Sequence, residues 1–300
     1  MNGILIIDKP AGITSHDVVS RVRRILKTKR VGHTGTLDPF ATGVMVILVG
    51  QATRLAQFLD KDEKEYEAVV RFGFETDTGD KTGRQKAKGK WQNTVTKDDV
   101  VAVLPDFTGS IMQTPPMYSA KKVDGKKLYE HARKGETIER KAVSVNISQL
   151  EILNDLNENS LESGTWDLGL RIACSAGTYI RALAEDIGRK VGTGAHLAEL
   201  RRMRAGKFSI DQSLTLDQLE RLEDPSSALI YMKEAVSHLP SLVLNDDRVE
   251  KTKNGLSTRI DDVKFNDGGA VQVVDDAGDL IAIGFYDEAE KAIRPKVVLV

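Results

Sequence analysis

A continuous apolar run from Val44 to Val49 is the feature that most constrains how this chain can fold. The run has the length of one strand and carries no polar face, so it predicts a strand near the centre of a sheet, buried on both sides. Lys64 to Phe74 instead alternates between apolar and polar side chains, which is typical of a half-buried strand. Gly3 to Ile7, Val143 to Ile152 and Trp166 to Cys174 are also predicted to be strands.

Helices are predicted from their N-terminal signals. Thr14 with Asp17, and Thr96 with Asp99, have the spacing of a capping box, and Thr178 is the predicted N-cap of a third helix. Two of these signals precede apolar residues at helical spacing, namely Val18, Val19, Val22, Ile25 and Leu26, and Ile180, Leu183, Ala184, Ile187 and Val191. Strands and helices together predict an α+β fold.

The chain is predicted to form two domains, residues 1–238 and residues 239–300. After Pro240 the sequence changes to short strand patterns separated by Gly and Asp, which predicts a small all-β module. Within the larger domain, residues 76–93 are predicted to be a polar loop or hairpin insertion. Residues 108–141 are predicted to be a long, basic and irregular excursion from the core.

Composition narrows the class of protein. With 40% hydrophobic and 29% charged residues the chain has the profile of an ordinary soluble protein, which excludes disordered and collagen-like classes. Cys174 is the only cysteine, so an intrachain disulfide and a Cys-based metal site are excluded. No apolar run approaches the about 20 residues of a membrane span, and no signal peptide is recognised. We therefore expect a cytoplasmic protein.

The formal net charge of −1 conceals a strong asymmetry along the chain. Residues 1–60 contain eight Lys and Arg against four Asp and Glu, and residues 171–210 contain eight against three. Residues 211–300 reverse this balance, with ten basic residues against eighteen acidic ones. A nucleic acid is therefore expected to contact the first two thirds of the chain.

The stretch from Gly32 to Gly43 holds the densest group of chemically special residues. It contains three glycines, a proline, a histidine and one carboxylate, Asp38, and it leads directly into the apolar strand. Such a stretch predicts a shaped loop whose backbone approaches a ligand. The alternative is an Asx-turn in which Asp38 stabilises its own loop. A phosphate-binding loop is not supported, because the Gly-x-x-x-x-Gly-Lys-Ser/Thr order is absent.

This loop resembles the signature loop of bacterial TruB-type tRNA pseudouridine synthases, whose aspartate occupies the position of Asp38. Further motifs resemble the family in its order and span most of residues 3–210: Asp8-Lys9-Pro10-x-Gly12-x-x-Ser15, Lys64-x-Tyr66, Gly73-x-x-Thr76-Asp77-Thr78-x-Asp80, Pro115-Pro116-x-Tyr118-Ser119-Ala120-x-Lys122, Gly125-x-x-x-Tyr129-x-x-Ala132-Arg133-x-Gly135, Gly177-Thr178-Tyr179-Ile180-Arg181 and His196-Leu197-x-x-Leu200-Arg201-Arg202.

The resemblance implies a mixed, largely antiparallel sheet with flanking helices, followed by a PUA-like barrel. It implies an isomerase that converts the uridine of the tRNA TΨC arm, position 55, to pseudouridine, with a further role in tRNA folding. The reaction cuts uracil from its ribose, turns it and rejoins it through carbon. It involves no redox change and no external group, so neither a cofactor nor a metal is expected. The expected partner is the T-arm stem-loop of tRNA, with no membrane, and the enzyme is expected to be a monomer.

The resemblance assigns catalytic roles to Asp38, Tyr66 and Arg181. Asp38 is the ionised carboxylate, acting either as nucleophile or as base at the sugar. Arg181 keeps that carboxylate charged and oriented; spacing alone favours instead an ion pair of Arg181 with Glu185 on an exposed helix face. Tyr66 stacks on the target base and serves the late proton transfer from carbon. The alternative is that Tyr66 is an ordinary core residue.

The resemblance also implies substrate-binding residues. The target uridine must leave the folded T-loop, and His33 is the residue that fills the gap. Leu200 lines the uracil pocket, although it could equally be a core residue. Lys9 and Tyr179 belong to the same set. Residues 108–141 resemble the family's segment that grips RNA and orders on binding.

Arg201 and Arg202 complete the predicted binding residues. With Arg204 and Lys207 they form a basic run beside Leu200. Such a run is usually a solvated face, and next to a pocket it is also a plausible phosphate track.

Two other functions stay open from the sequence. One is a non-catalytic RNA-binding or RNA-folding protein, although the joint presence of the three catalytic residue types argues against it. The other is a glycosidase with a pair of carboxylates, which needs a second acid at the pocket. Asp8, Asp77 and Asp80 are the candidates for that acid, but nothing in the sequence places them there.

Overall fold

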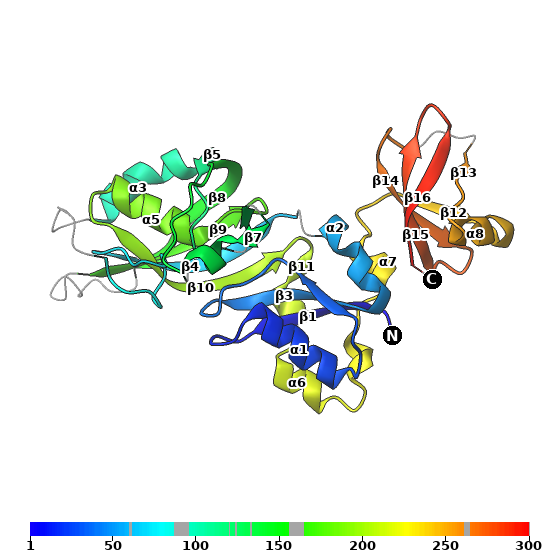
Figure 1. Ribbon diagram of the computed structural model, residues 1–300, viewed down its shortest axis with the longest axis horizontal. Coiled ribbons are helices and arrows are strands. Elements are labelled where there is room, and N and C mark those ends of the chain that lie inside the picture. Colours follow the sequence, from blue (N-terminus) through cyan, green and yellow to red (C-terminus); the bar gives the residue numbers. More distant parts are fainter. Residues whose placement is uncertain are drawn as a thin grey trace.

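The computed structural model describes residues 1–59, 62–86, 96–119, 121–123, 125–132, 134–155, 165–260 and 265–299. The described residues form two large sheets and a short hairpin, with helices packed around them (Figure 1). The expected α+β fold is confirmed.

The larger sheet is made of strands from the first 209 residues. They are β1 (Gly3–Lys9), β2 (Val31–Thr34), β3 (Thr42–Val49), β4 (Lys64–Phe72), β5 (Gly109–Gln113), β8 (Val143–Asp155), β9 (Trp166–Cys174), β10 (Ala195–Ala205) and β11 (Phe208–Ser209). Their order is β1-β3-β10-β4-β9-β8-β5, with β2 on β3 and β11 on β10. In this described sheet β3 and β10 run parallel and the other neighbours antiparallel, so the prediction of a mixed, largely antiparallel sheet is confirmed.

Strands β3 and β4 follow from their sequence patterns. The apolar strand β3 lies between β1 and β10 and is buried along nearly its whole length, as the run Val44 to Val49 predicts. In β4 the burial alternates residue by residue, and Tyr66, Ala68, Val70 and Phe72 point into the main apolar core. The side chain of Tyr66 therefore lies on the same face as that core.

Helices flank the sheet. They are α1 (Ser15–Ile25), α2 (Ala56–Leu59), α3 (Lys97–Val103), α4 (Leu128–Ala132), α5 (Ile180–Lys190), α6 (Leu216–Arg221) and α7 (Met232–Ala235), with short 3-10 helices η1 (Gly50–Leu55), η2 (Leu104–Phe107), η4 (Ile210–Gln212) and η5 (Pro225–Ala228). The capping boxes of α1 and α3 form as predicted. The predicted cap of α5 is wrong: its N-cap is Tyr179, and the Thr178 hydroxyl donates to the Ser175 carbonyl at 2.9 Å instead.

The interpretation of residues 108–141 as one irregular excursion is wrong at its start. Strand β5 pairs antiparallel with β8 at the edge of the larger sheet, and Gln113 is buried. This strand has the sequence Gly-Ser-Ile-Met-Gln, which lacks the alternation of apolar and polar side chains that predicts a half-buried strand. After it come Pro115, the hairpin of β6 (Lys122–Val123) and β7 (Lys126–Lys127), and α4. Residues 120, 124 and 133, and residues 87–93 of the predicted polar loop, lie outside the described residues.

A second sheet contains the C-terminal strands. They are β12 (Ser241–Leu244), β13 (Thr258–Arg259), β14 (Ala270–Asp275), β15 (Leu280–Asp287) and β16 (Ala292–Val298), in the order β12-β14-β15-β16-β13. The expectation of an all-β module is wrong, because α8 (Asp246–Lys253) packs on this sheet. Among its residues only Val249 and Thr252 are buried, so the sequence shows no apolar stripe that would reveal the helix.

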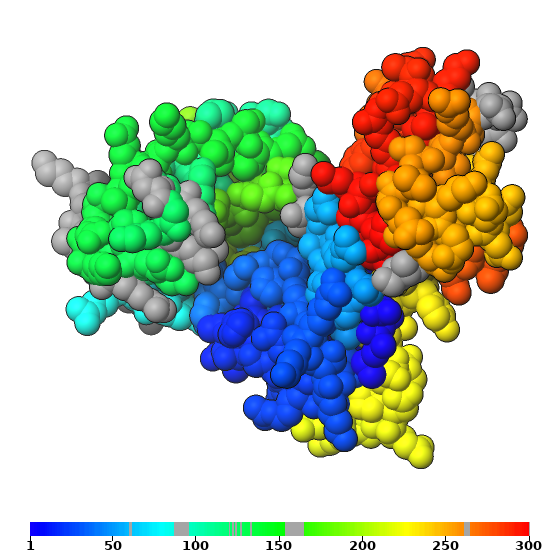
Figure 2. All heavy atoms as spheres, turned by 45° about the vertical axis from the view of Figure 1, so that its right-hand side comes forward, coloured from blue at the N-terminus to red at the C-terminus, as the bar shows by residue number. Residues whose placement is uncertain are grey.

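The two sheets share one apolar cluster, to which β1 and β3 contribute Ile4 and Val46 and the C-terminal strands contribute Ile283 and Val297. The rings of Phe58 and Phe285 lie 6.3 Å apart across this contact. Figure 2 shows the C-terminal part, orange to red, packed against the light-blue segment that contains η1 and α2.

Candidate active site

The loop that carries Asp38 connects β2 to β3 and is held by buried side chains from three directions. The Lys9 ammonium group donates to the carbonyls of Pro39 at 3.2 Å and Ala41 at 2.7 Å. The Ser15 hydroxyl, at the start of α1, donates to the Leu37 carbonyl at 3.0 Å and accepts from the Leu37 amide at 2.9 Å. The loop is therefore fixed before any ligand binds.

Arg202 on β10 supplies the third anchor. It is 1% exposed, and its guanidinium donates to the carbonyls of Gly35 at 3.0 Å and Val44 at 2.7 Å. Gly43 has a φ of +99°, and a Cβ there would lie 2.2 Å from the Arg202 carbonyl oxygen. Only glycine permits this approach of the loop to β10.

Asp38 pairs with Arg181, the second residue of α5. Arg181 Nε lies 2.8 Å from Asp38 Oδ2, and its Nη2 donates to Asp38 Oδ1 at 3.3 Å. The Asp38 side chain is 34% exposed and the Arg181 side chain only 6%, so the carboxylate is much more open to a ligand than the guanidinium. The alternative pair of Arg181 with Glu185 is wrong, because the Glu185 carboxylate lies 3.1 Å from Lys86 Nζ.

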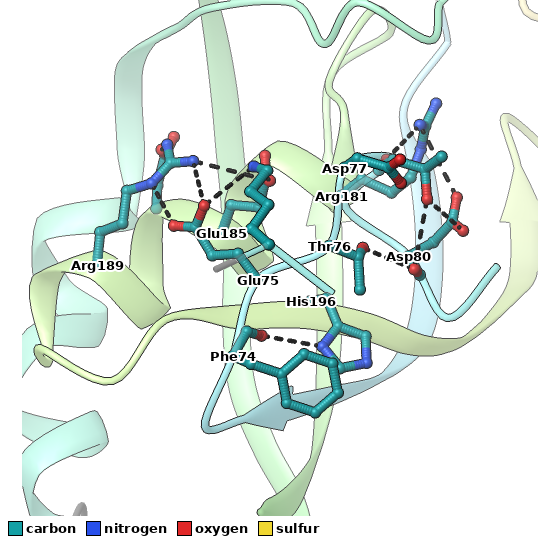
Figure 3. A network of polar contacts seen from close by, with 12 residues as sticks. Phe74, Glu75, Thr76, Asp77, Asp80, Arg181, Glu185, Arg189 and His196 are labelled. Carbon is teal, nitrogen blue, oxygen red and sulfur yellow. Dashed lines mark hydrogen bonds and ion pairs between the residues drawn. The ribbon is translucent and has the colours of Figure 1, made fainter. Parts of the chain in front are cut away.

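The rest of the Arg181 guanidinium is occupied by groups from two other segments. Nη1 donates to the Thr78 carbonyl at 2.8 Å and Nη2 to the Tyr118 carbonyl at 2.6 Å. Asp80 Oδ2 lies 3.9 Å from Nη1. Figure 3 shows the side chains of Asp80 and Arg181 next to each other. Arg181 therefore joins Asp38 to two segments far away in the sequence.

The electrostatics of Asp38 reflect these neighbours. Desolvation raises the pKa of Asp38 above its ordinary value, and the carboxylate of Asp80 adds to the rise, while the charges of Arg181 and Lys9 oppose it. Burial also lowers the pKa of Lys9 to about 8. Arg181 is therefore the main group that keeps Asp38 ionised.

Asp38 opens onto a cavity of about 260 Å³. Its lining comes from the Asp38 loop, the start of α5 and the strands beside them: Gly35, Thr36, Leu37, Asp38, Lys64, Tyr66, Ser119, Ser175, Ala176, Gly177, Thr178, Tyr179, Ile180, Arg181, Leu200 and Arg202. The volume lies below the roughly 300 Å³ at which sites for drug-sized ligands begin, so the cavity suits a smaller group. Asp38 is the one carboxylate among these lining residues.

The structure brings four further residues singled out in the sequence to this cavity, namely Tyr66, Tyr179, Leu200 and Arg202. Tyr66 and Arg202 are cross-strand partners on β4 and β10. Burial raises the pKa of the Tyr66 hydroxyl, and a hydrogen bond with Arg202 opposes the rise. Tyr66 is thus both a core residue and a lining residue.

His33 and Lys9 are not among the lining residues. His33 lies on β2 and is half-buried; burial lowers the pKa of its imidazole, and Nδ1 has no hydrogen-bond partner among the described residues. Lys9 is wholly buried and bonded to the loop backbone, so in this state it contacts the loop rather than a ligand.

The basic run on β10 is paired within the folded chain, and Arg202 also lines the cavity. Arg202 is buried, and the Arg201 guanidinium lies 2.7 Å from Asp8 Oδ2. Arg204 lies 2.5 Å from Glu65 Oε1, and the Lys207 ammonium donates to the Glu234 carbonyl. The acids that pair with these arginines lie far away in the sequence. The positive charge of the run is therefore neutralised only in the folded chain.

Comparison with known proteins identifies the family. Residues 23–180 match the model described as "TruB family pseudouridylate synthase (N terminal domain)", and residues 181–243 match "tRNA pseudouridylate synthase B C-terminal domain". The chain belongs to the TruB family. The resemblance seen in its motifs is confirmed.

Relatives in the TruB family match nearly the whole chain. The protein named "tRNA pseudouridine synthase B" of Bacillus subtilis (strain 168) is 38% identical over 305 residues, covering 100% of this chain and 98% of its own length. The protein of the same name from Solibacter usitatus (strain Ellin6076) is 42% identical over 288 residues, covering 95% of each. A solved structure titled "Crystal Structure of a Cbf5-Nop10-Gar1 Complex" is 27% identical, with a TM-score of 0.74, and covers 99% of this chain and 85% of that chain.

Two further residues belong to this TruB family site, and the sequence does not predict that they do: Asp80 and Gln113. Asp80 belongs to a family-like motif, but the sequence offers it no role beyond that of a second acid. It is 4% exposed, and its Oδ1 accepts from the Thr82 amide at 2.9 Å and the Thr78 hydroxyl at 2.9 Å. Gln113, at the end of β5, was not considered. Its Nε2 donates to the Tyr179 carbonyl at 3.0 Å and its Oε1 accepts from the Tyr179 amide at 2.7 Å. The Thr78-x-Asp80-x-Thr82 spacing was a usable signal for Asp80, whereas Gln113 had none.

Two further findings concern the described residues of this TruB family member as a whole. None of their helices is long and apolar enough to cross a membrane. They contain no group of three or more His, Cys, Asp or Glu side chains that could hold a metal ion.

Proposed function

We propose that this chain converts the uridine at position 55, in the TΨC arm of tRNA, to pseudouridine, with Asp38 as the catalytic carboxylate. Its membership of the TruB family makes it a pseudouridine synthase, an isomerase that acts on uridine in tRNA. The observation that carries the role of Asp38 is its position: among the described residues that line the cavity it is the one carboxylate, and it is fixed by Arg181 and open to a ligand.

The chemistry requires little else from the protein. The bond between uracil N1 and ribose C1′ breaks, the base turns, and a bond from C5 to C1′ replaces it. C5 loses its proton and N1 gains one, so the product is an isomer of the substrate. An ionised Asp38 adds to C1′ or removes a proton from the sugar, and both routes start from the same carboxylate. Because desolvation opposes the ionised form, the Arg181 fork is what makes the carboxylate available.

The lining residues suit a flipped uracil. The Tyr66 ring offers a face on which the base can stack, and its hydroxyl can assist removal of the C5 proton. Leu200 and Tyr179 complete the lining around the base. His33, on the strand that leads into the Asp38 loop, fills the gap left in the T-loop.

The proposal also covers RNA binding, the localisation of the enzyme and its oligomeric state. Residues 114–141 grip the T-arm, and the contact of the Tyr118 carbonyl with Arg181 connects this segment to the active site. Residues 239–300 form a PUA-like module. The enzyme works as a cytoplasmic monomer, and it also assists tRNA folding.

The glycosidase alternative loses support from the positions of the candidate acids. Asp8 pairs with Arg201, and the Asp77 carboxylate accepts from the Arg84 amide at 2.9 Å. Asp80 lies behind Arg181 and is not among the lining residues of the cavity. A glycosidase needs its two carboxyl groups on either side of the scissile bond.

The proposal is tested with an unmodified tRNA transcript that carries tritium at uridine C5. We expect wild-type protein to release tritium and Asp38→Asn to release it roughly 10⁴-fold more slowly, while tRNA binding is retained because phosphate contacts elsewhere supply most of the affinity. Absence of release by the wild type would contradict the activity. Undiminished release by Asp38→Asn would contradict the role of Asp38.

A further inference from the structure

Helix α5 presents a stripe of charged side chains that begins at the active site. Arg181, Glu185 and Arg189 follow one another at intervals of four residues, so they lie on one face of the helix. Eight residues of α-helix rise about 12 Å. The stripe therefore extends from the partner of Asp38 to a point well outside the cavity.

The segment of residues 73–86 lies along this stripe, as Figure 3 shows. At its far end Glu75 accepts from Arg189 Nε at 2.6 Å and Nη2 at 3.1 Å. In the middle, Lys86 Nζ lies 3.0 Å from Glu75 and 3.1 Å from Glu185. At the near end the segment supplies the Thr78 carbonyl to Arg181.

Close packing accompanies these polar contacts. Gly79 has a φ of +73°, and a Cβ there would lie 3.3 Å from the carboxyl carbon of Glu185 and 3.5 Å from Arg181 Cβ. A side chain at this position would push the segment away from the helix. The glycine therefore keeps the segment in contact with the stripe.

The segment is fixed independently to the sheet that carries the Asp38 loop. The Leu197 amide on β10 donates to the Gly79 carbonyl at 3.0 Å, and the Lys81 amide donates to the Leu197 carbonyl at 3.0 Å. The same strand holds the Asp38 loop through Arg202. A continuous set of contacts thus runs from the Asp38 loop through β10 and the segment to Arg189, and back along α5 to Arg181.

The contact of Glu75 with Arg189 is stronger than an ordinary surface pair. The side chain of Glu75 is 9% exposed, and it receives both arms of the guanidinium. Burial favours the neutral acid, but hydrogen bonds from Arg189 and Lys86 outweigh it and lower the pKa of Glu75. Its carboxylate is therefore charged and held in one orientation.

We propose that Glu75 and Arg189 are positioning residues, which set the place of α5 along its axis and thereby hold the Arg181 guanidinium against Asp38. Neither residue lines the cavity. This inference rests on the proposed role of Asp38 in catalysis. The alternative is that the pair adds stability alone.

The chain offers a matched control for a purely stabilising ion pair. Arg71 donates to Asp167 through Nε at 2.7 Å and Nη2 at 2.6 Å, and the two side chains are 40% and 10% exposed. The corresponding exposures for Arg189 and Glu75 are 47% and 9%. This pair links β4 to β9.

The experiment compares Glu75→Gln, Arg189→Lys and Asp167→Asn with wild type. Tritium release measures kcat and KM, and thermal unfolding measures stability. Carbon-13 NMR of labelled aspartate measures the pKa of Asp38, whose signal is assigned by its absence in Asp38→Asn. For Glu75→Gln we expect kcat to fall about tenfold, which is less than the roughly hundredfold loss that a 1 Å misplacement can cause. The KM for tRNA should stay within about twofold of the wild-type value. Since Arg181 lowers the pKa of Asp38, loosening Arg181 should raise it. Arg189→Lys keeps the charge and loses the fork, so it should show a smaller change in the same direction.

Asp167→Asn should lower the melting temperature as much as Glu75→Gln while leaving kcat and the pKa of Asp38 unchanged. The proposal is overturned if Glu75→Gln lowers stability alone, or if the control changes kcat and the pKa of Asp38 equally. If Glu75→Gln does not fold, the kcat of Arg189→Lys and the pKa of Asp38 in that variant decide between a positioning role and stability alone. If wild type releases no tritium, the proposed function fails, and the pKa of Asp38 in the variants still decides whether the pair positions Arg181.

Discussion

The two sheets of this molecule differ in what they bury. The part built on the larger sheet buries charged side chains, namely Lys9, Lys64, Glu75, Asp80, Asp167, Arg181 and Arg202. In the described part of the C-terminal sheet, the buried polar residues are Thr252, Thr258 and Gln272, and none is charged. Buried charges cost free energy unless each is paired and hydrogen-bonded. Lys9, Lys64, Asp80, Arg181 and Arg202 lie at the Asp38 loop, at its cavity or beside Arg181, so they can support the chemistry. The C-terminal sheet contributes apolar packing to the shared cluster.

Among changes that leave Asp38 in place, breaking its buried pair should have the largest effect. Arg181→Met removes the cation between Asp38 and Asp80 while keeping most of the apolar volume. We expect kcat to fall by roughly 10²–10³-fold, as for loss of one preorganised electrostatic group. Tritium release measures the rate and filter binding the affinity for tRNA, which should change little. A variant with near-normal kcat would contradict the importance of the pair.

A change in the C-terminal sheet should lower stability and leave the rate unchanged. Ile283 is wholly buried in the cluster shared by both sheets, so Ile283→Ala should lower the free energy of unfolding by about 2–5 kcal/mol. Below the unfolding transition its kcat should equal that of wild type. Val243→Ala, at a residue 59% exposed in the same sheet, is the control and should stay within about 0.5 kcal/mol. Denaturant titration measures both free energies of unfolding. A lowered kcat in folded Ile283→Ala would contradict the claim that the C-terminal sheet contributes packing and not chemistry.

The pH dependence of the rate sharpens the account of Asp38. The carboxylate acts when ionised, and its pKa is raised by desolvation. The rate should therefore fall with acidification along a limb centred above about 3.9, the ordinary value for Asp. Single-turnover rates across this range provide the measurement. A limb at or below the ordinary value would show that Arg181 overcomes desolvation completely.

The smallest effect concerns stability. Because the pKa of Asp38 is higher in the folded state than in the unfolded state, its ionisation favours unfolding, and stability is lost as pH rises through the folded pKa. Asp38→Asn should thus unfold at a slightly higher temperature than wild type at neutral pH, and the difference should disappear in acid. Calorimetry at two pH values checks this. A less stable variant at neutral pH would mean that the ion pair with Arg181 outweighs desolvation.

Local signals in the sequence predicted much of the fold. The capping boxes of Thr14 with Asp17 and Thr96 with Asp99 need only residues three apart, and both form. The sequence does not reveal the edge strand β5 or helix α8, because β5 lacks apolar alternation and α8 lacks an apolar stripe. Such elements are stabilised by partners that the local sequence does not contain.

The site was predicted less completely than the fold. The motifs led to Asp38 and Arg181, and the structure brings the two together across 143 residues of sequence. Burial of Arg202 and the pairing of Arg201 with Asp8 could not be foreseen, because the partners become neighbours only in the sheet. Gln113 was invisible for the same reason, since its contact with Tyr179 spans 66 residues.

The most direct test of the central claim is the position of the product. An unmodified tRNA transcript is incubated with wild type or Asp38→Asn, labelled with a carbodiimide that marks pseudouridine, and copied by primer extension. The account predicts one stop, at position 55 of the tRNA, with wild type and none with Asp38→Asn. A stop at another uridine with wild type, or a stop at position 55 with Asp38→Asn, would contradict it.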